Sequence, residues 1–175
     1  MVDFNGNSGT SQRQLSNTSA LNLLTNQSTG NTGTFFVVFA SPTSGANDGV
    51  VTYKNYPDGI QMRAWGRLAI GHNNSTNGTR NFTPNPVEKP LIISYKGNKS
   101  SGTSMTAFRN DLVYTTSSSS SALMSNGITF GAKRNTTTSY NEYFSGYISE
   151  VIFYNADLSN ANINMVKTYL AIKYG

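Results

Sequence analysis

Short apolar segments recur along almost the whole chain, and polar, glycine-bearing segments separate them. Within several of these segments apolar and polar residues alternate, a period typical of β-strands with one buried face. The segments are VDF (2–4), ALNLL (20–24), TFFVVFA (34–40), GVVTY (49–53), GIQMRAW (59–65), RLAIGH (67–72), PLIISY (90–95), SMTAFR (104–109), DLVYTT (111–116), ITFGA (128–132) and YFSGYISEVIFY (143–154). Roughly ten strands joined by turns predict an all-β fold, a two-sheet antiparallel β-sandwich, rather than a βαβ fold.

Individual segments refine this prediction. Residues 35–39 are apolar on both alternating faces, which predicts a central strand covered on both sides. Residues 49–53 and 60–65 alternate better, which predicts strands with one face in solvent. Asn110 and Asp111 are residue types that tolerate the positive φ angles of a tight hairpin, so we expect adjacent antiparallel strands on either side of them.

The C-terminal segment breaks the strand pattern and predicts an amphipathic helix. Ser159 is a candidate N-cap. Four apolar residues follow at helical spacing on one face: Ile163, Val166, Leu170 and Tyr174. Three others are expected to widen this stripe: Met165, Tyr169 and Ile172. We therefore expect the helix to pack on or beside the sandwich, with Lys167 and Lys173 in its C-terminal half, where they suit the helix dipole.

Composition limits the function. A length of 175 residues predicts one domain, 1–175, with a core of its own. Asn, Ser and Thr together make up 64 residues, only 12% of residues are charged, and the net charge of +5 comes from scattered Lys and Arg, so nucleic acid is not an expected partner. The absence of cysteine excludes disulfides and thiolate metal sites. No apolar run approaches the roughly 20 residues that span a bilayer, so membrane insertion is not expected.

The closing segment FSGYISEVIFYNADLSNANINMVKTYLAIKYG resembles the last strand and helix of laminin-G-like, concanavalin A-like jelly-roll domains of bacteria and phages. Such domains end with F-x-G-x-I-x-E-V-x-x-Y-N-x-x-L-S, followed by a helix that finishes Y-L-A-x-K-Y-G. The matching positions are Phe144, Gly146, Ile148, Glu150, Val151, Tyr154, Asn155, Leu158, Ser159, Tyr169, Leu170, Ala171, Lys173, Tyr174 and Gly175. VDFNGNSG resembles the first strand of these domains, and residues 91–116 resemble their central hairpin unit, with Asp111 in place of the usual turn glycine.

The resemblance implies a jelly-roll fold and a role in binding other molecules. Such modules bind carbohydrate or protein on surface proteins, secreted enzymes or virions, and some hold calcium. The predicted function is therefore a non-catalytic recognition module for a glycan or polysaccharide, located outside the cell, on its surface or on a virion. One alternative is a virion decoration or adhesin spacer that contacts other subunits of a virion or of its parent surface protein. Another is an unrecognised polysaccharide-active enzyme.

The acidic residues offer no catalytic pair. Glycoside hydrolysis requires two carboxylates that flank the bond. The eight acids never stand two residues apart: Asp3, Asp48, Asp58, Glu88, Asp111, Glu142, Glu150 and Asp157. Glu150, expected on a strand face with Ile148 and Ile152, is interpreted as a structural, hydrogen-bonded carboxylate. No catalytic residue is assigned.

Calcium is the metal that this composition allows, because it accepts carboxylate, amide and backbone oxygens. One histidine and no cysteine disfavour a transition-metal site. Asp48 in SGANDG and Asp58 in YPDG are the candidate calcium ligands, and the alternative is that both Asp-Gly pairs only form turns.

The stretch QMRAWGRLAIGHNNSTNGTRN (61–81) holds the only tryptophan and the only histidine. Strand alternation puts Arg63 and Trp65 on one side, an arrangement in which the ring stacks on a sugar and the guanidinium binds its hydroxyls. The alternative is that Trp65 anchors the core and that Arg63 stacks on it without a ligand. The loop after the next strand is a candidate rim. The candidate ligand-binding residues are Arg63, Trp65, Arg67, His72, Asn73, Asn74 and Arg80.

Overall fold

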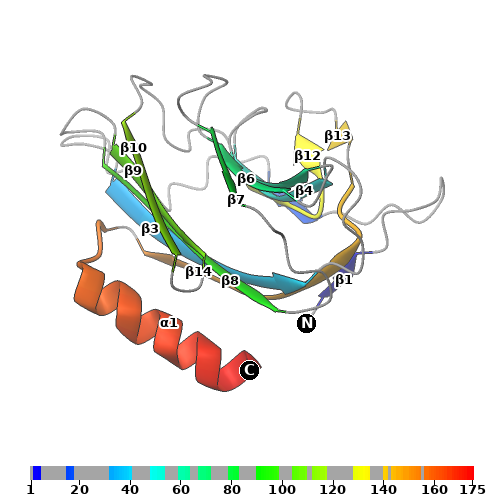
Figure 1. Ribbon diagram of the computed structural model, residues 1–175. Helices are drawn as coiled ribbons and strands as arrows, with labels where there is room; N and C mark the ends of the chain where they lie inside the picture. Colours follow the sequence, from blue (N-terminus) through cyan, green and yellow to red (C-terminus); the bar gives the residue numbers. More distant parts are fainter. Residues whose placement is uncertain are drawn as a thin grey trace.

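The computed structural model describes residues 2–4, 15–17, 32–40, 48–53, 59–63, 67–71, 79–82, 90–98, 104–109, 112–117, 128–134, 140–141, 143–154 and 156–175. In these ranges the chain forms two six-stranded antiparallel sheets, a two-stranded sheet and one helix. Figure 1 shows the two large sheets facing each other, with the helix on the far side of one of them. The predicted two-sheet sandwich with a C-terminal helix is confirmed at this level.

Sheet A carries the helix. Its strands are, in spatial order, β1 (Val2–Phe4), β14 (Gly146–Tyr154), β3 (Thr32–Ala40), β8 (Leu91–Asn98), β9 (Ser104–Arg109) and β10 (Leu112–Ser117). Leu112 pairs with Arg109 in an antiparallel ladder, as the Asn110-Asp111 turn predicted. β1 and β14 are paired antiparallel although they come from the N-terminal and C-terminal parts of the chain.

Sheet B lies above sheet A in Figure 1. Its strands are, in spatial order, β2 (Leu15–Asn17), β11 (Ile128–Phe130), β4 (Asp48–Tyr53), β5 (Gly59–Arg63), β6 (Arg67–Gly71) and β7 (Thr79–Phe82). The small sheet pairs β12 (Lys133–Arg134) with β13 (Tyr140–Asn141). The sequence did not predict β2, β7, β12 or β13, because these segments contain no apolar run. The strand expected at 20–24 lies outside the described residues.

β3 is the central strand of sheet A, between β14 and β8. Every residue from 34 to 39 is fully buried, as the unbroken apolar run predicted. Phe36 and Val38 pack against the helix. Because side chains alternate across a strand, Phe35, Val37 and Phe39 point to the opposite face, toward sheet B. One strand thus supplies side chains to both hydrophobic layers of the molecule.

Two β-bulges change the expected faces. The ladder between β14 and β3 shifts between Ile148 and Glu150, so Glu150 shares the helix side with Ile152 while Ile148 turns to the other face. The expectation that Glu150 shares a face with both isoleucines is therefore wrong for Ile148. A second shift, between Gly49 and Val51, leaves Val50 and Val51 both fully buried, although alternation predicted one exposed face.

The helix α1 (Asn160–Tyr174) begins and ends at the residues that the sequence indicated. The Ser159 hydroxyl accepts a hydrogen bond from the Asn162 backbone N–H at 3.2 Å, which confirms the N-cap. Buried Thr34 fixes the approach to the helix: its Oγ1 donates to the Ala156 carbonyl at 2.8 Å and accepts from Leu158 N–H at 3.1 Å. No helix in the described part of the chain is long and apolar enough to cross a membrane.

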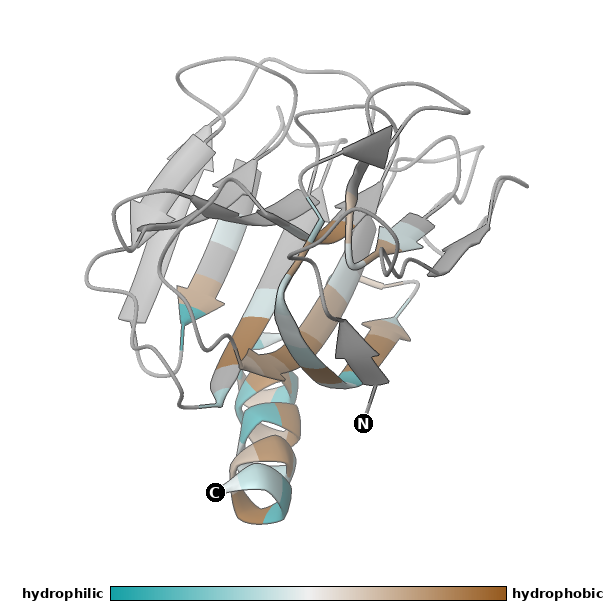
Figure 2. Cartoon of the chain, turned by 90° about the vertical axis from the view of Figure 1, so that its right-hand side faces the viewer, coloured by the Kyte–Doolittle hydropathy of each residue, from teal (hydrophilic) through white to brown (hydrophobic). Residues whose placement is uncertain are grey.

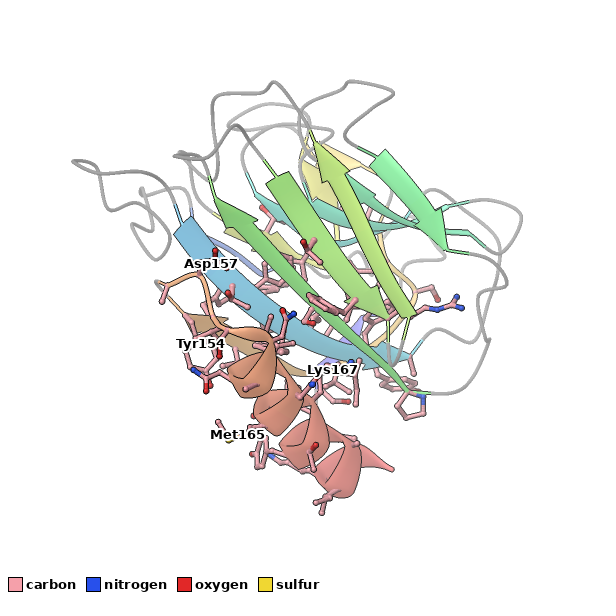
Figure 3. The ribbon with its side chains drawn as sticks, turned by 60° about the vertical axis from the view of Figure 1, so that its left-hand side comes forward. Tyr154, Asp157, Met165 and Lys167 are labelled. Carbon is pink, nitrogen blue, oxygen red and sulfur yellow. The ribbon has the colours of Figure 1, made fainter. Side chains whose placement is uncertain are left out.

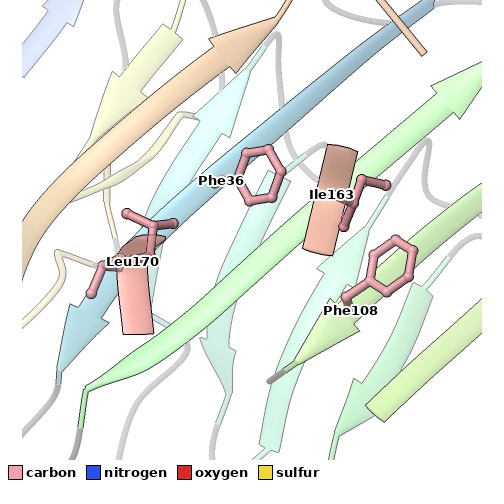
Figure 4. Packing of buried hydrophobic residues seen from close by; sticks show 5 residues of the cluster. Phe36, Phe108, Ile163 and Leu170 are labelled. Carbon is pink, nitrogen blue, oxygen red and sulfur yellow. The ribbon is translucent and has the colours of Figure 1, made fainter. Parts of the chain in front are cut away.

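One face of α1 is buried against sheet A. Ile163 and Leu170 are fully buried against side chains that include Phe36 and Phe108 (Figure 4). Val166 and Tyr174 pack at the edge of this cluster, as predicted. A buried aliphatic side chain contributes about 1.5–3 kcal/mol, so this cluster accounts for the docking of the helix.

The expected widening of the buried stripe is wrong. Met165 is 64% exposed, Tyr169 48% and Ile172 82%. Each helical residue advances about 100° around the axis, so Ile172 lies about 200° from Leu170 and faces away from the sheet. The sequence analysis placed the three residues in the core because α1 is apolar on both sides, although their spacing from Leu170 puts each of them about 100° or more away from it around the helix.

Gly146 is required where β14 enters sheet A. Its φ is +157°, and a Cβ at this position would collide with the Ala40 carbonyl oxygen and with the Phe144 ring. Phe144 in turn meets Phe39 edge-on, with ring centroids 6.0 Å apart. The glycine of the family phrase therefore lets β14 lie against β3 above a packed aromatic pair.

Candidate functional site

The β5–β6 hairpin carries the central part of the predicted ligand site. Arg63 is the last residue of β5, Arg67 is the first residue of β6, and the two are directly paired across the ladder. Trp65 lies in the three-residue connection between them, outside the described residues.

The register separates the two faces of this ladder. Ile60 pairs with Ile70 and Met62 with Leu68, so these four residues belong to one, apolar face. The other face holds two further pairs, Gln61 with Ala69 and Arg63 with Arg67. We call this second face the polar face of sheet B. It agrees with the alternation predicted for IQMRAW.

Arg80 is not brought to the polar face. It lies on β7 and pairs with Ile70, which places it on the apolar face of the ladder. Ile70 stands three positions after Arg67, an odd offset along the strand, so Arg67 and Arg80 belong to opposite faces. Sequence reasoning grouped the two because β7 reads as a polar loop, and its register is not visible in the residues.

His72, Asn73 and Asn74 lie outside the described residues. They follow Gly71, the last residue of β6, whereas Arg67 is the first. Four steps of about 3.3 Å along a strand separate these two ends by about 13 Å. Gly71, which precedes His72 in the sequence, therefore lies at the opposite end of β6 from the arginine pair.

One of the two candidate calcium ligands lies in the described part of the chain. Asp48 begins β4 and pairs with Met62 of β5, next to the end of the arginine ladder. Asp58 lies outside the described residues. Within the described ranges no three His, Asp or Glu side chains group closely enough to hold a metal ion. A calcium site at Asp48 and Asp58 stays a prediction.

A second polar cluster joins α1 to β14. Glu150 Oε2 accepts hydrogen bonds from Lys173 Nζ at 3.0 Å and from the Tyr174 hydroxyl at 2.8 Å. Lys173 Nζ also donates to the Tyr169 hydroxyl at 2.9 Å. All four residues belong to the phrase that carries the family resemblance. We call them the helix clamp, because they tie the C-terminal turn of α1 to the sheet.

The helix clamp shifts the pKa of its members in the direction expected of a structural ion pair. Partial burial raises the pKa of Glu150, but the hydrogen bonds from Lys173 and Tyr174 outweigh it and hold that pKa below the usual value. The hydrogen bonds to Tyr169 and Glu150 raise the pKa of Lys173. Burial and the nearby carboxylate raise the pKa of Tyr174. Glu150 is thus a hydrogen-bonded carboxylate whose charged form is favoured, which agrees with the structural role that the sequence analysis gave it.

Sequence reasoning missed one group of surface residues. The exposed large apolar side chains of the described chain are Tyr147, Met165, Tyr169 and Ile172. All four lie on the helix side of sheet A: three on α1, and Tyr147 opposite Ala40, which shares a face with Val38. A helical wheel drawn from Leu170 would have shown that three of them face away from the sheet.

No family model and no curated protein matches the sequence. Solved structures do match. A heptameric SAP-like pentraxin from Limulus polyphemus is 12% identical, with a TM-score of 0.63 over 94% of this chain and 80% of that chain. The Ruminococcus gnavus IT-sialidase CBM40 bound to α2,3-sialyllactose is 12% identical, with a TM-score of 0.60 over 79% and 83%. Domain 4 of AbnA, a GH43 extracellular arabinanase from Geobacillus stearothermophilus, in complex with arabinotriose, is 12% identical, with a TM-score of 0.63 over 94% and 75%.

Identities this low show the fold alone. The neighbours have the jelly-roll β-sandwich of lectins and carbohydrate-binding modules. The narrower laminin-G-like resemblance stays a prediction. By its two facing antiparallel sheets and its structural neighbours, the chain has a jelly-roll β-sandwich fold.

Proposed function

We propose that the chain is a non-catalytic carbohydrate-recognition module that acts outside the cell, and that its ligand is an acidic glycan. We place the site on the polar face of sheet B at the end of the β5–β6 ladder, where Arg63 and Arg67 are paired and where Trp65 stands between them in the sequence. The single observation that carries the proposal is the direct pairing of Arg63 with Arg67 on either side of the only tryptophan.

The charge of this pair favours an anionic ligand. Like charges directly opposite each other in an antiparallel ladder destabilise the sheet. An anion between them removes that repulsion, and the planar guanidinium group binds carboxylate or sulfate oxygens through two parallel hydrogen bonds. A uronate, a sialate or a sulfated sugar offers such an anion. The net charge of +5 adds a favourable long-range field for the same ligands.

Trp65 supplies the second part of saccharide recognition. An indole ring presents a flat apolar surface to the C–H face of a sugar, while neighbouring donors bind the ring substituents. Two of the structural neighbours were solved with a bound saccharide, one of them the acidic sialyllactose. This supports a glycan as the ligand class but assigns no residue of this chain.

The test is a glycan array that contains sialylated, uronic-acid, sulfated and neutral glycans. We expect binding to the acidic glycans. This binding should weaken as the salt concentration rises from about 50 to about 500 mM, because the Debye length falls from about 14 to about 4 Å and exposed ion pairs are screened. The variant Arg63→Gln/Arg67→Gln should lose binding.

The matched control is Lys133→Gln/Arg134→Gln, which removes two positive charges from the small sheet β12–β13. This variant should bind as the wild type does. Equal losses in both variants would mean that only net charge matters, and no binding to any glycan on the array would overturn the proposed function.

A further inference from the structure

The polar face of sheet B continues beyond the arginine pair as a second row of residues. Gln61 pairs with Ala69, and Ala69 pairs with Asn81 of β7. Gln61 and Ala69 each stand two positions from an arginine along their strands, so this row shares the face of Arg63 and Arg67 at a distance of about 7 Å. Because alanine carries only a methyl group, the row is low in the middle and has a carboxamide residue on either side.

A third row contains a pair of glycines. Gly59 pairs with Gly71, and Gly71 pairs with Thr79 of β7. Glycine inside a sheet weakens it, and it often marks a bulge or a place where a ligand approaches the backbone closely. The β5–β6 ladder keeps an unbroken register from this pair to the arginine pair, so a bulge between these two strands does not explain the glycines.

The small residues lie in line along β6. Arg67, Ala69 and Gly71 follow one another at intervals of two, so they share one face of the strand over about 13 Å. Gln61 on β5 and Asn81 on β7 stand on the two sides of this line. We call these five residues the β6 track. The track is longer than a single sugar ring, and it is uncharged beyond its arginine end.

The sheet limits the direction that a ligand can take. The glycine row continues from Gly59 to Thr52 of β4 and on to Thr129 of β11. Thr129 is fully buried, so this row is closed on β11 and a ligand cannot follow it across the whole sheet. On the other face of the ladder, Ile60 pairs with Val51, which is fully buried, so the apolar face is the one that turns to the core.

The lysines of α1 are engaged within the fold. Lys173 Nζ lies 3.0 Å from Glu150 Oε2. Lys167 Nζ lies 5.6 Å from the centroid of the Phe108 ring and faces the sheet in Figure 3. An acidic sugar therefore finds its charge partner at the arginine pair more readily than at the helix.

We propose that an acidic oligosaccharide lies extended along the β6 track, with its acidic group at Arg63 and Arg67 and its next sugars over Ala69 and Gly71. This inference rests on the proposed function and narrows its ligand class to a chain of two or more sugars, in place of a single acidic sugar. A carboxamide both donates and accepts hydrogen bonds, so it suits the hydroxyl and acetamido groups of a sugar. The carboxamide residues of the track, one on each side, are its specificity-determining residues.

Calorimetric titration with matched acidic monosaccharides and trisaccharides tests the track. The probe pairs are free sialic acid with α2,3-sialyllactose, galacturonate with trigalacturonate, and galactose 6-sulfate with a sulfated galactose trisaccharide. Within the class that binds, we expect the trisaccharide to bind about tenfold more tightly than the monosaccharide, or better, because its further sugars contact the track.

Two variants separate the track from the arginine pair. Ala69→Leu fills the low middle of the track and should weaken trisaccharide binding by about tenfold or more, so that the ratio of the two affinities falls toward one. Gln61→Ala/Asn81→Ala should also weaken trisaccharide binding by about tenfold, because donors and acceptors for the further sugars are lost.

Ala161→Leu is the matched control. It makes the same substitution at an exposed position of α1, which lies on the far side of sheet A from sheet B (Figure 1, Figure 2). This variant should keep both the affinities and their ratio. Circular dichroism checks the fold of every variant, and if Ala69→Leu does not fold, the wild-type probe pairs and the carboxamide variant decide.

The outcomes distinguish this inference from the function on which it rests. If Arg63→Gln/Arg67→Gln loses binding while the wild type binds the monosaccharide and the trisaccharide equally, the proposed function stands and the β6 track is overturned. The track is also overturned if Ala69→Leu and Gln61→Ala/Asn81→Ala both keep the full preference for the trisaccharide. A wild type that binds none of the acidic probes overturns the proposed function, and the track with it.

Discussion

The face of sheet A that lies under α1 is closed by the chain itself, whereas the polar face of sheet B ends in two arginines placed opposite each other. Under the helix, the charged residues Glu150 and Lys173 neutralise each other within the fold. At the β5–β6 hairpin, Arg63 and Arg67 share one sign. The ion pair at the helix therefore has a structural role within the fold, whereas the arginine pair concentrates positive charge at one end of a ladder, the place where we propose that an anionic ligand binds.

The largest expected effect is on the closed face. Leu170→Ala removes a fully buried side chain from the cluster between α1 and sheet A, and the cavity should lower the free energy of unfolding by about 2–5 kcal/mol. Ile172→Ala, on the exposed side of the same helix, should change it by less than about 0.5 kcal/mol. Chemical denaturation of both variants measures the difference, and equal losses would contradict the buried and exposed sides assigned to α1.

Gly146→Ala should have the next largest effect. The new Cβ meets the Ala40 carbonyl and the Phe144 ring, so β14 must shift, and we expect a loss of about 1–3 kcal/mol. Gly175→Ala is the comparison, because Gly175 also has a positive φ, +100°, but open space around its Cβ position. Backbone strain alone should cost about 0.5–1 kcal/mol there. If both variants lose the same stability, crowding at β14 is not the reason for the glycine.

The helix clamp predicts a pH dependence. The pKa of Glu150 is lower in the folded protein than in the unfolded chain, so the clamp stabilises the fold above the unfolded pKa of about 4.3 and loses this contribution as pH falls through the folded pKa. Glu150→Gln removes the charge and should cost up to about 1 kcal/mol at pH 7, because the pair is partly exposed. Melting curves of the two proteins should converge below pH 4. A constant difference down to pH 2 would mean that Glu150 acts through packing.

The smallest expected effect on stability is at Ser94, a buried hydroxyl, and Thr34, whose buried hydroxyl makes two hydrogen bonds, is the comparison. Among the described residues, Ser94 Oγ is buried without a hydrogen-bond partner, between Phe36 and Phe108 in the ladder. Ser94→Ala should be neutral or stabilise the fold by about 1 kcal/mol, because no bond is lost. Thr34→Val removes two hydrogen bonds and should destabilise by about 1–3 kcal/mol. A clear loss on Ser94→Ala would show that its hydroxyl is satisfied by a bound water.

Much of the fold could be predicted from the sequence. The buried strand at 35–39, the Ser159 cap and the C-terminal helix each depend on local pattern, and each is confirmed. The two bulges, at Val50 and Ser149, could not be predicted, because a bulge depends on the register with a distant strand and reverses the faces that alternation assigns.

The candidate site was predicted less completely. The sequence placed Arg63 and Arg67 on consecutive strands but gave no sign that they are directly paired. It grouped Arg80 with them, although register puts Arg80 on the other face. Nearness along the chain was the only available measure of nearness in space, and pairing across a sheet is determined by turns and by strands far apart in sequence.

Hydrogen–deuterium exchange of the wild type, with and without the acidic glycan that binds best on the array, tests the contrast between the two faces most directly. In the wild type we expect the glycan to add protection in peptides that cover residues 59–71 and to leave residues 160–174 unchanged. In Arg63→Gln/Arg67→Gln we expect the glycan to add no protection anywhere. Protection centred on α1, or protection at 59–71 that survives in the double variant, would contradict the assignment of recognition to sheet B and of structural support to the helix.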